Sequence, residues 1–138
     1  MKKLILLLTI LYTTAFAQSL NWVNTNLDKA LETAKKENKI LMVYIEAEHC
    51  PWCIKMRTTT LSDKDVVRNL NKDYILYKLD ANSADGKKYF SNIAITPTTL
   101  FVTDNKEVLE QIDGYLDTEF FFWSMAKAEN KFKELKSK

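Results

Sequence analysis

The sequence ILMVYIEAEHCPWC at residues 40–53 joins a short apolar run to the only two cysteines of the chain. The run at 40–45 is rich in β-branched and aromatic residues, which predicts a buried strand. Pro51 suits the first position of a helix, so we expect Cys50 to be the N-cap of that helix. Unpaired backbone N–H groups and the positive end of the helix dipole stabilise a thiolate at this position. Cys50 is therefore the candidate nucleophile.

Cys53 lies one helical turn after Cys50, and side chains three residues apart share one face of a helix. The expected Cα separation of roughly 5–6 Å lies within the range that a disulfide can close. Two other kinds of site use the same spacing. One is half of a zinc site, for which only His49 and acidic residues remain as further ligands, and the other is a structural disulfide. We expect a redox-active pair and no bound metal.

The rest of the chain alternates between helical and strand patterns. Helices are predicted at residues 27–38, from 51 to a break near 61, at 62–70 with Ser62 as the N-cap, at 83–92 and at 116–138. Strands are predicted at residues 40–45, 74–79, 98–102 and 107–112. A turn at Asp104 and Asn105 makes the last two strands a hairpin that closes the sheet.

The C-terminal helical segment carries two apolar stripes. We expect core packing for the first stripe, which contains Phe121, Met125, Ala128, Phe132 and Leu135. The second stripe contains Leu116, Phe120 and Trp123. Core packing is the favoured interpretation of this stripe too, and the alternative is an exposed aromatic patch that contacts a partner or a membrane surface.

The strand, the C-x-x-C motif, the helix and a later Ile-Thr-Pro-Thr at residues 95–98 together resemble the thioredoxin fold. Trp22, the helix at 27–36 and the residues after the motif are similar to small periplasmic thioredoxin-like proteins and to the C-terminal domain of the DsbD reductase. The resemblance covers nearly all of residues 18–138. It implies an α/β thioredoxin fold, with a central mixed β-sheet and helices on both sides.

The resemblance also implies roles for the residues of the motif. Cys50 attacks a substrate disulfide, and Cys53 then resolves the mixed disulfide that forms. Pro51 and Trp52 complete the active-site motif between the two cysteines. These four residues form the expected catalytic centre.

Thr96, Pro97 and Gly114 match the substrate-binding positions of the family. Most X–Pro bonds are trans, so the residues alone predict an ordinary strand entry at Pro97. In thioredoxin-like proteins, however, this proline is cis and faces the C-x-x-C motif, and the residue before it offers backbone groups to an extended substrate. The family also has a glycine after the last strand, where a side chain would obstruct the groove.

One departure from the family concerns proton transfer. Thioredoxins have a buried acid six residues before the first cysteine and a lysine beside it on the neighbouring strand, and these positions are assigned here to Tyr44 and Leu76. The loss of both charges avoids leaving one of them buried and unpaired. Glu46 shares the strand face of Tyr44, so we expect Glu46 to accept the proton of Cys53. The Tyr44 hydroxyl and water are the alternatives.

We expect the pKa of the reduced Cys50 thiol to lie below its ordinary value of about 8.5. Helix-end effects reach about 1–2 kcal/mol when partly buried, whereas exposed charges such as Glu46 and Glu48 are screened. A protonated His49 lowers this pKa further if its side chain faces the sulfur instead of solvent. Ultraviolet absorbance of the thiolate measures the pKa, and His49→Ala tests the histidine. A first pKa above that of free cysteine contradicts the prediction.

Residues 1–17 have the pattern of a secretory signal peptide. A basic start at 1–3 precedes an apolar stretch at 4–11, and Ala-Phe-Ala at 15–17 matches a cleavage site. The apolar stretch is short for a membrane span, so an uncleaved anchor is the less favoured alternative. Removal leaves one thioredoxin-like domain at 18–138, with 18 basic and 18 acidic residues. This balance gives no support for a nucleic-acid partner.

These expectations describe a periplasmic thiol–disulfide oxidoreductase that reduces disulfides of client proteins. It needs no cofactor, acts as a monomer and receives electrons from a membrane thiol donor. Because Pro51 directly after Cys50 also occurs in the oxidase DsbA, a disulfide oxidase or isomerase is the alternative among enzymes. Outside enzymes, the alternatives are a binding or chaperone module and a copper-handling protein that uses Cys50, Cys53 and His49.

Overall fold

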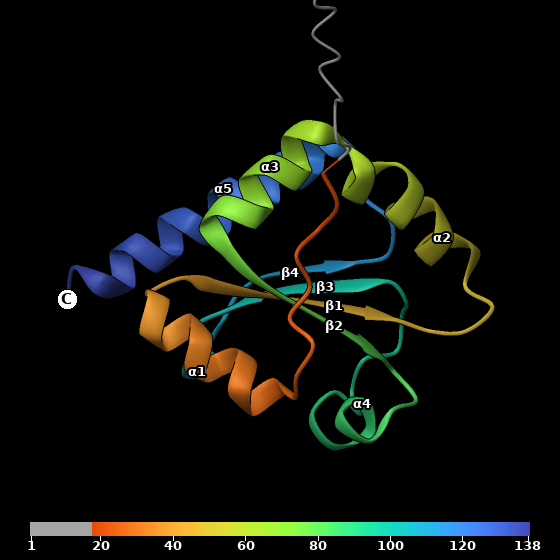
Figure 1. The fold of residues 1–138 in the computed structure, drawn as a ribbon, viewed down its shortest axis with the longest axis horizontal. Helices are drawn as coiled ribbons and strands as arrows, with labels where there is room; N and C mark the ends of the chain where they lie inside the picture. The colour runs from red at the N-terminus through yellow and green to blue at the C-terminus, as the bar shows by residue number, and fades with distance from the viewer. Residues whose placement is uncertain (1–17) are drawn as a thin grey trace, which may run out of the picture.

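The computed structural model describes residues 18–138, so the predicted signal peptide at 1–17 lies outside the described residues. The described part is built on a four-stranded sheet in the order β2-β1-β3-β4. Its strands are β1 (Ile40–Glu46), β2 (Tyr74–Asp80), β3 (Thr98–Val102) and β4 (Val108–Asp113). β1 and β2 are parallel, and the other two pairs are antiparallel. The predicted mixed sheet is therefore confirmed (Figure 1).

Helices cover both faces of the sheet (Figure 1). They are α1 (Leu27–Glu37), α2 (Pro51–Thr58), α3 (Lys64–Asp73), α4 (Ala84–Tyr89) and α5 (Thr118–Lys136), with a 3-10 turn at Thr60–Ser62. A side chain caps each helix by accepting a backbone N–H bond, and the caps are Asn26, Cys50, Asp63, Ser83 and Asp117. This capping satisfies donors that the first helical turn leaves unpaired.

The beginning of α3 differs from the prediction. Asp63, and not Ser62, is the N-cap, because its carboxylate accepts the N–H groups of Asp65 and Val66 at 2.9 and 3.1 Å. Ser62 belongs to the preceding 3-10 turn, where its hydroxyl donates to the Arg57 carbonyl oxygen. α4 is also shorter than predicted and ends at Tyr89.

Alternate residues of β1 supply the two halves of the core, because successive side chains of a strand point to opposite faces. Met42 and Tyr44 belong to the half that packs against α2, α3 and α5. Leu41, Val43 and Ile45 belong to the half under α1. All five side chains are fully buried. The continuous apolar run at 40–45 thus reflects a strand covered on both faces.

The two stripes of α5 have different environments. Phe121, Met125 and Ala128 are buried, as predicted for the first stripe. In the second stripe, Leu116 lies before α5 and packs half-buried against the core, as expected. Phe120 and Trp123 are 55% and 71% exposed, so their expected core packing is wrong. α5 packs against the sheet with one side only, and these two aromatic residues lie on its solvent side. None of the helices in residues 18–138 is long and apolar enough to cross a membrane.

Candidate active site

Cys50 lies where β1 passes into α2, at the N-cap position predicted from Pro51. The backbone N–H of Cys53 donates to Cys50 Sγ at 3.1 Å. The two cysteines form a disulfide with a Cα separation of 5.2 Å, which confirms the expected pairing. Cys53 is only 1% exposed, whereas Cys50 is half-buried. Cys50 is thus the more accessible sulfur of the pair.

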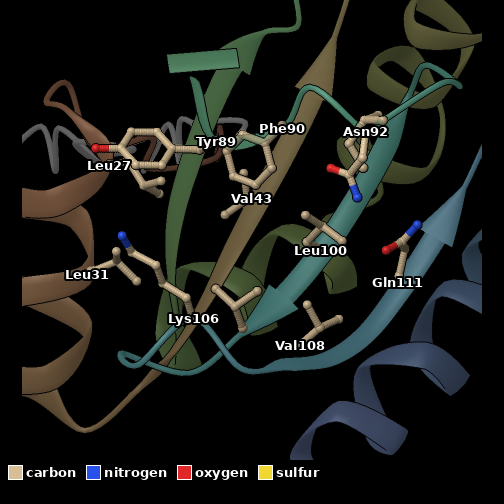
Figure 2. A pocket seen from close by; sticks show the side chains of 12 residues that line it. Leu27, Leu31, Val43, Tyr89, Phe90, Asn92, Leu100, Lys106, Val108 and Gln111 are labelled. Carbon is tan, nitrogen blue, oxygen red and sulfur yellow. The ribbon is translucent and has the colours of Figure 1, made fainter. Parts of the chain in front are cut away.

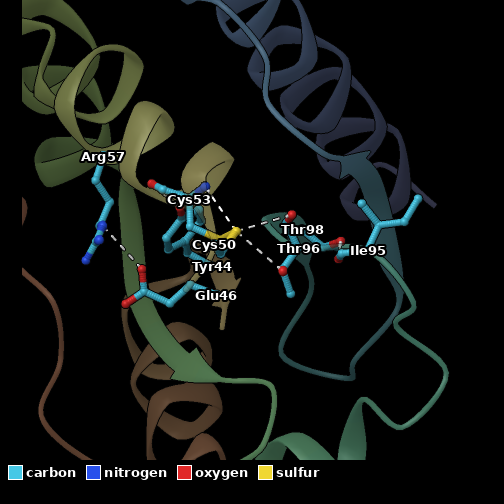
Figure 3. Close-up of a disulfide and its surroundings, with 8 residues drawn as sticks. All are labelled: Tyr44, Glu46, Cys50, Cys53, Arg57, Ile95, Thr96 and Thr98. Atoms are coloured by element: carbon cyan, nitrogen blue, oxygen red, sulfur yellow. Dashed lines mark hydrogen bonds and ion pairs between the residues drawn. A yellow bond between two sulfur atoms is a disulfide. The ribbon is translucent and has the colours of Figure 1, made fainter. Parts of the chain in front are cut away.

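The segment before β3, which contains Thr96, lies beside the sulfur of Cys50 (Figure 3). The Thr96–Pro97 peptide bond is cis, as the resemblance implied. The Thr96 hydroxyl donates to Cys50 Sγ at 3.5 Å, and the Thr96 carbonyl oxygen lies 3.4 Å from the same sulfur. The structure therefore brings Thr96 together with the cysteine that is expected to attack the substrate.

Gly114 follows β4 and connects to the same segment, because its N–H donates to the Pro97 carbonyl oxygen at 2.7 Å. Its φ of +89° lies in the left-handed region, which favours glycine. A Cβ at this position would meet no atom within 4 Å. Backbone conformation, and not close packing, therefore requires glycine here, and the space beside it remains open.

The assignment of Leu76 to the lysine position is wrong. In the parallel register of β1 and β2, Tyr44 is paired with Lys78, and Leu76 is paired with Met42. Because Asp80 is paired with Glu46, the neighbour of Tyr44 lies two residues before Asp80 and not four. A lysine is thus present beside Tyr44, and its side chain is exposed.

Glu46 is the acidic partner of this lysine. Its oxygens lie 3.6 Å from Lys78 Nζ and 3.3 Å from Arg57 Nε, and its side chain is 18% exposed. Figure 3 shows the carboxylate directed towards Arg57, with Tyr44 and Cys50 beside it. Among the described residues, Glu46 Oε2 accepts no hydrogen bond of good geometry. This oxygen is held by the ion pair with Arg57.

Tyr44 is a hydrogen-bond donor and not a base. Its hydroxyl donates to the Cys53 carbonyl oxygen at 3.3 Å. Burial raises the pKa of Tyr44 above its usual range, Glu46 adds to this effect, and Arg57 opposes it. A phenol with a raised pKa stays protonated at neutral pH, so it cannot accept a proton from Cys53.

We expect Glu46→Gln to slow resolution of a mixed disulfide by about 10²-fold near neutral pH, as for loss of a general base. Stopped-flow measurement of resolution against pH tests this expectation. Tyr44→Phe should leave the pH profile unchanged, and Glu48→Gln is the matched control for removal of a nearby carboxylate. An unchanged profile in both Glu46→Gln and Tyr44→Phe would show that neither residue is the base and that water alone carries the proton.

A polar hollow of about 250 Å³ adjoins Cys50, and Glu48, His49 and Arg57 help to line it. His49 is exposed and has a φ of 56°, which turns the chain sharply before Cys50. No three His, Cys, Asp or Glu side chains within residues 18–138 are placed to hold a metal ion together. Cys50 and Cys53 are joined in a disulfide, and the His49 side chain is exposed.

An apolar cavity of about 220 Å³ lies elsewhere, on the face of the sheet under α1 (Figure 2). Leu31, Val43, Phe90 and Leu100 are among the side chains that line it. α2 contributes to the core on the other face of the sheet. This cavity is therefore separate from the disulfide.

Sequence reasoning missed two basic residues of the site. Arg57 lies seven residues after Cys50, which is two helical turns and places both on one face of α2. Lys78 is the one charged residue within an otherwise apolar and aromatic run at 74–79. Both positions carried a signal, but only the three-dimensional structure shows that Glu46 forms ion pairs with both residues.

The thioredoxin-like domain family matches residues 27–129 of the chain. A thioredoxin from Thermus thermophilus is 25% identical, with a TM-score of 0.65, and the match covers 86% of this chain and 88% of that one. A putative disulphide-isomerase from Bacteroides thetaiotaomicron is 22% identical, with a TM-score of 0.71 and coverage of 83% and 96%. The C-terminal domain of DsbD from Neisseria meningitidis, in its oxidised form, is 19% identical, with a TM-score of 0.60 and coverage of 79% and 99%.

Comparison with curated proteins gives no match. The family match, the mixed sheet and the disulfide within a C-x-x-C motif agree with one another. Together, they indicate a thiol–disulfide oxidoreductase with a redox-active Cys50–Cys53 pair. The chain belongs to the thioredoxin-like domain family.

Proposed function

We propose that this protein is an exported reductase that reduces disulfides of client proteins in the periplasm. The Cys50 thiolate attacks one sulfur of a client disulfide, and the other client sulfur leaves as a thiolate and takes up a proton. Cys53 then loses its proton and attacks Cys50 Sγ, which releases the first client sulfur. Two electrons pass to the client, and the Cys50–Cys53 disulfide remains.

The observation that carries this proposal is the unequal exposure of two bonded sulfurs. Cys50 is half-buried beside Thr96, and Cys53 is almost fully buried. An incoming disulfide therefore reaches Cys50 first, and Cys53 is held ready to complete the exchange. Trp52 and Ile95 belong to the two segments that form the site, and both side chains are apolar and exposed. They offer surface to an unfolded or extended client.

Export and the electron donor are parts of the same proposal. The signal-like pattern at residues 1–17 supports transfer to the periplasm, and residues 18–138 would act there as a monomer without a cofactor. An oxidising compartment would soon exhaust a reductant. A membrane thiol donor is therefore required to reduce the Cys50–Cys53 disulfide after each turnover.

The reduction potential of the Cys50–Cys53 pair decides between a reductase and an oxidase. Equilibration with defined glutathione buffers, followed by thiol alkylation, gives this potential. We expect a value near that of thioredoxin, about −270 mV, and a value near that of DsbA, about −120 mV, would favour the oxidase. Reduction of insulin with dithiothreitol separates a catalyst from a passive binding module, and copper titration tests the metal-handling alternative.

A further inference from the structure

Three side chains next to the disulfide form a cluster that we call the Lys55 clamp: Trp52, Lys55 and Tyr115. The rings of Trp52 and Tyr115 lie 5.9 Å apart between centroids, with an angle of 34° between their planes. Lys55 Nζ lies 5.0 Å from the Trp52 centroid and 4.4 Å from the Tyr115 centroid. Both distances are within the range of cation–π attraction. The ammonium group is therefore held by two aromatic rings.

The Lys55 clamp borders the place where a client would lie. Trp52 lies between the two cysteines and is 55% exposed. Tyr115 follows Gly114, whose N–H donates to the Pro97 carbonyl oxygen. Lys55 is five residues along α2 from Cys50, which corresponds to about 7–8 Å along the helix axis. A positive charge is thus fixed beside the active-site motif, against Trp52 and Tyr115.

Lys55 differs from the other basic residues near the site in having no acidic partner. Arg57 and Lys78 both form ion pairs with Glu46. Lys55 forms none with any of residues 18–138. A free lysine side chain loses much rotamer freedom when it binds a ligand, but Lys55 is already ordered by the two rings. Its charge is therefore both available and positioned.

We propose that the Lys55 clamp selects clients that carry an acidic side chain two or three residues from the attacked cysteine. This inference rests on the proposed function, because it concerns the client of the same site. An extended client covers about 7–10 Å in two or three residues, so it can extend past Trp52 to the ammonium group that the Trp52 and Tyr115 rings hold. A carboxylate at this distance meets the ammonium group as the client disulfide reaches Cys50.

The test uses three synthetic peptides, each containing one cysteine and joined as a symmetrical disulfide dimer. The residues two and three positions from the cysteine, on both sides, are Glu, Gln or Lys. The measured quantity is the rate at which fully reduced protein releases free peptide thiol at low salt. We expect the Glu peptide to react about three to five times faster than the Gln peptide, as for a partly exposed ion pair, and the Lys peptide to react more slowly.

Variants assign this preference to Lys55. Lys55→Met should bring the ratio of the Glu and Gln rates to about one, and Lys55→Glu should make the Lys peptide the fastest. Lys72→Met is the matched control, since it removes the same charge from an exposed lysine of α3 just before the start of β2, at the other end of the sheet from Glu46 and Asp80. This control should retain the wild-type ratio. High salt should reduce the ratio in the wild-type protein.

Equal rates for the Glu and Gln peptides with wild-type protein overturn the inference, and so does a preference that persists in Lys55→Met. In either case, reduction of the Gln peptide would leave the proposed function intact. Failure to reduce any of the three peptides would overturn the proposed function and the inference together. If Lys55→Met does not fold, the order of the three rates in Lys55→Glu decides the result instead.

Discussion

Cys53→Ser is expected to accumulate covalent complexes with disulfide-containing proteins, and Cys50→Ser is expected to accumulate none. Cys50 is half-buried at the N-cap of α2, where it can attack a client. Cys53 is only 1% exposed, so without Cys50 it cannot reach a client disulfide. With Cys53 replaced by serine, the mixed disulfide at Cys50 has no resolving thiol and persists.

Non-reducing electrophoresis of each variant, incubated in its reduced form with oxidised clients, measures the complexes. Bands that dithiothreitol removes are the mixed disulfides. The double variant Cys50→Ser with Cys53→Ser controls for other attachment, since these are the only cysteines of the chain. We expect Cys50→Ser to reduce client disulfides no faster than buffer does. Equal trapping by the two single variants would contradict the roles given by their exposure.

Phe121→Ala should lower the free energy of unfolding by about 3–5 kcal/mol, the usual cost of removing a large buried aromatic side chain. Phe121 is fully buried, and its ring centroid lies 6.0 Å from that of Phe101 in β3. The substitution leaves a cavity where α5 packs against the sheet. Urea denaturation of the reduced protein, followed by far-ultraviolet circular dichroism, gives the free energy.

Phe120→Ala is the matched control, because it makes the same change one residue earlier in the same helix. Phe120 is 55% exposed, so its truncation should change the free energy of unfolding by no more than about 0.5 kcal/mol. Helix propensity changes equally in the two variants. A loss in Phe120→Ala as large as that in Phe121→Ala would mean that both sides of α5 are covered.

The local part of the fold could be predicted from sequence because its signals are local. The buried strand at 40–45, the N-cap at Cys50 and the disulfide to Cys53 all depend on residues within one short stretch. Helical periodicity also identified the buried stripe of α5 that contains Phe121. It could not show that Phe120 faces solvent, because periodicity groups residues by face but does not tell how many faces are covered.

The side-chain contacts of Lys78 and Tyr115 with distant elements were the part that the sequence could not supply. The position of Lys78 beside Tyr44 depends on the register of two parallel strands, which no short pattern fixes. The contact of Trp52 with Tyr115 likewise depends on how the chain after β4 approaches α2. The ion pair between Lys78 and Glu46 is therefore evident only in the three-dimensional structure.

The disulfide joins residues only three positions apart in the sequence, so it closes a very small ring of chain. In the chain-entropy account, a cross-link stabilises a fold by restricting the unfolded chain, and its effect grows with the length of the closed loop. A ring of this size contributes about 2 kcal/mol, against about 5 kcal/mol for a loop of 100 residues. Most of the stability of the domain must then come from its apolar core. Breaking and remaking the bond leaves the folded chain in place, so the same molecule can pass electrons repeatedly without a folding transition.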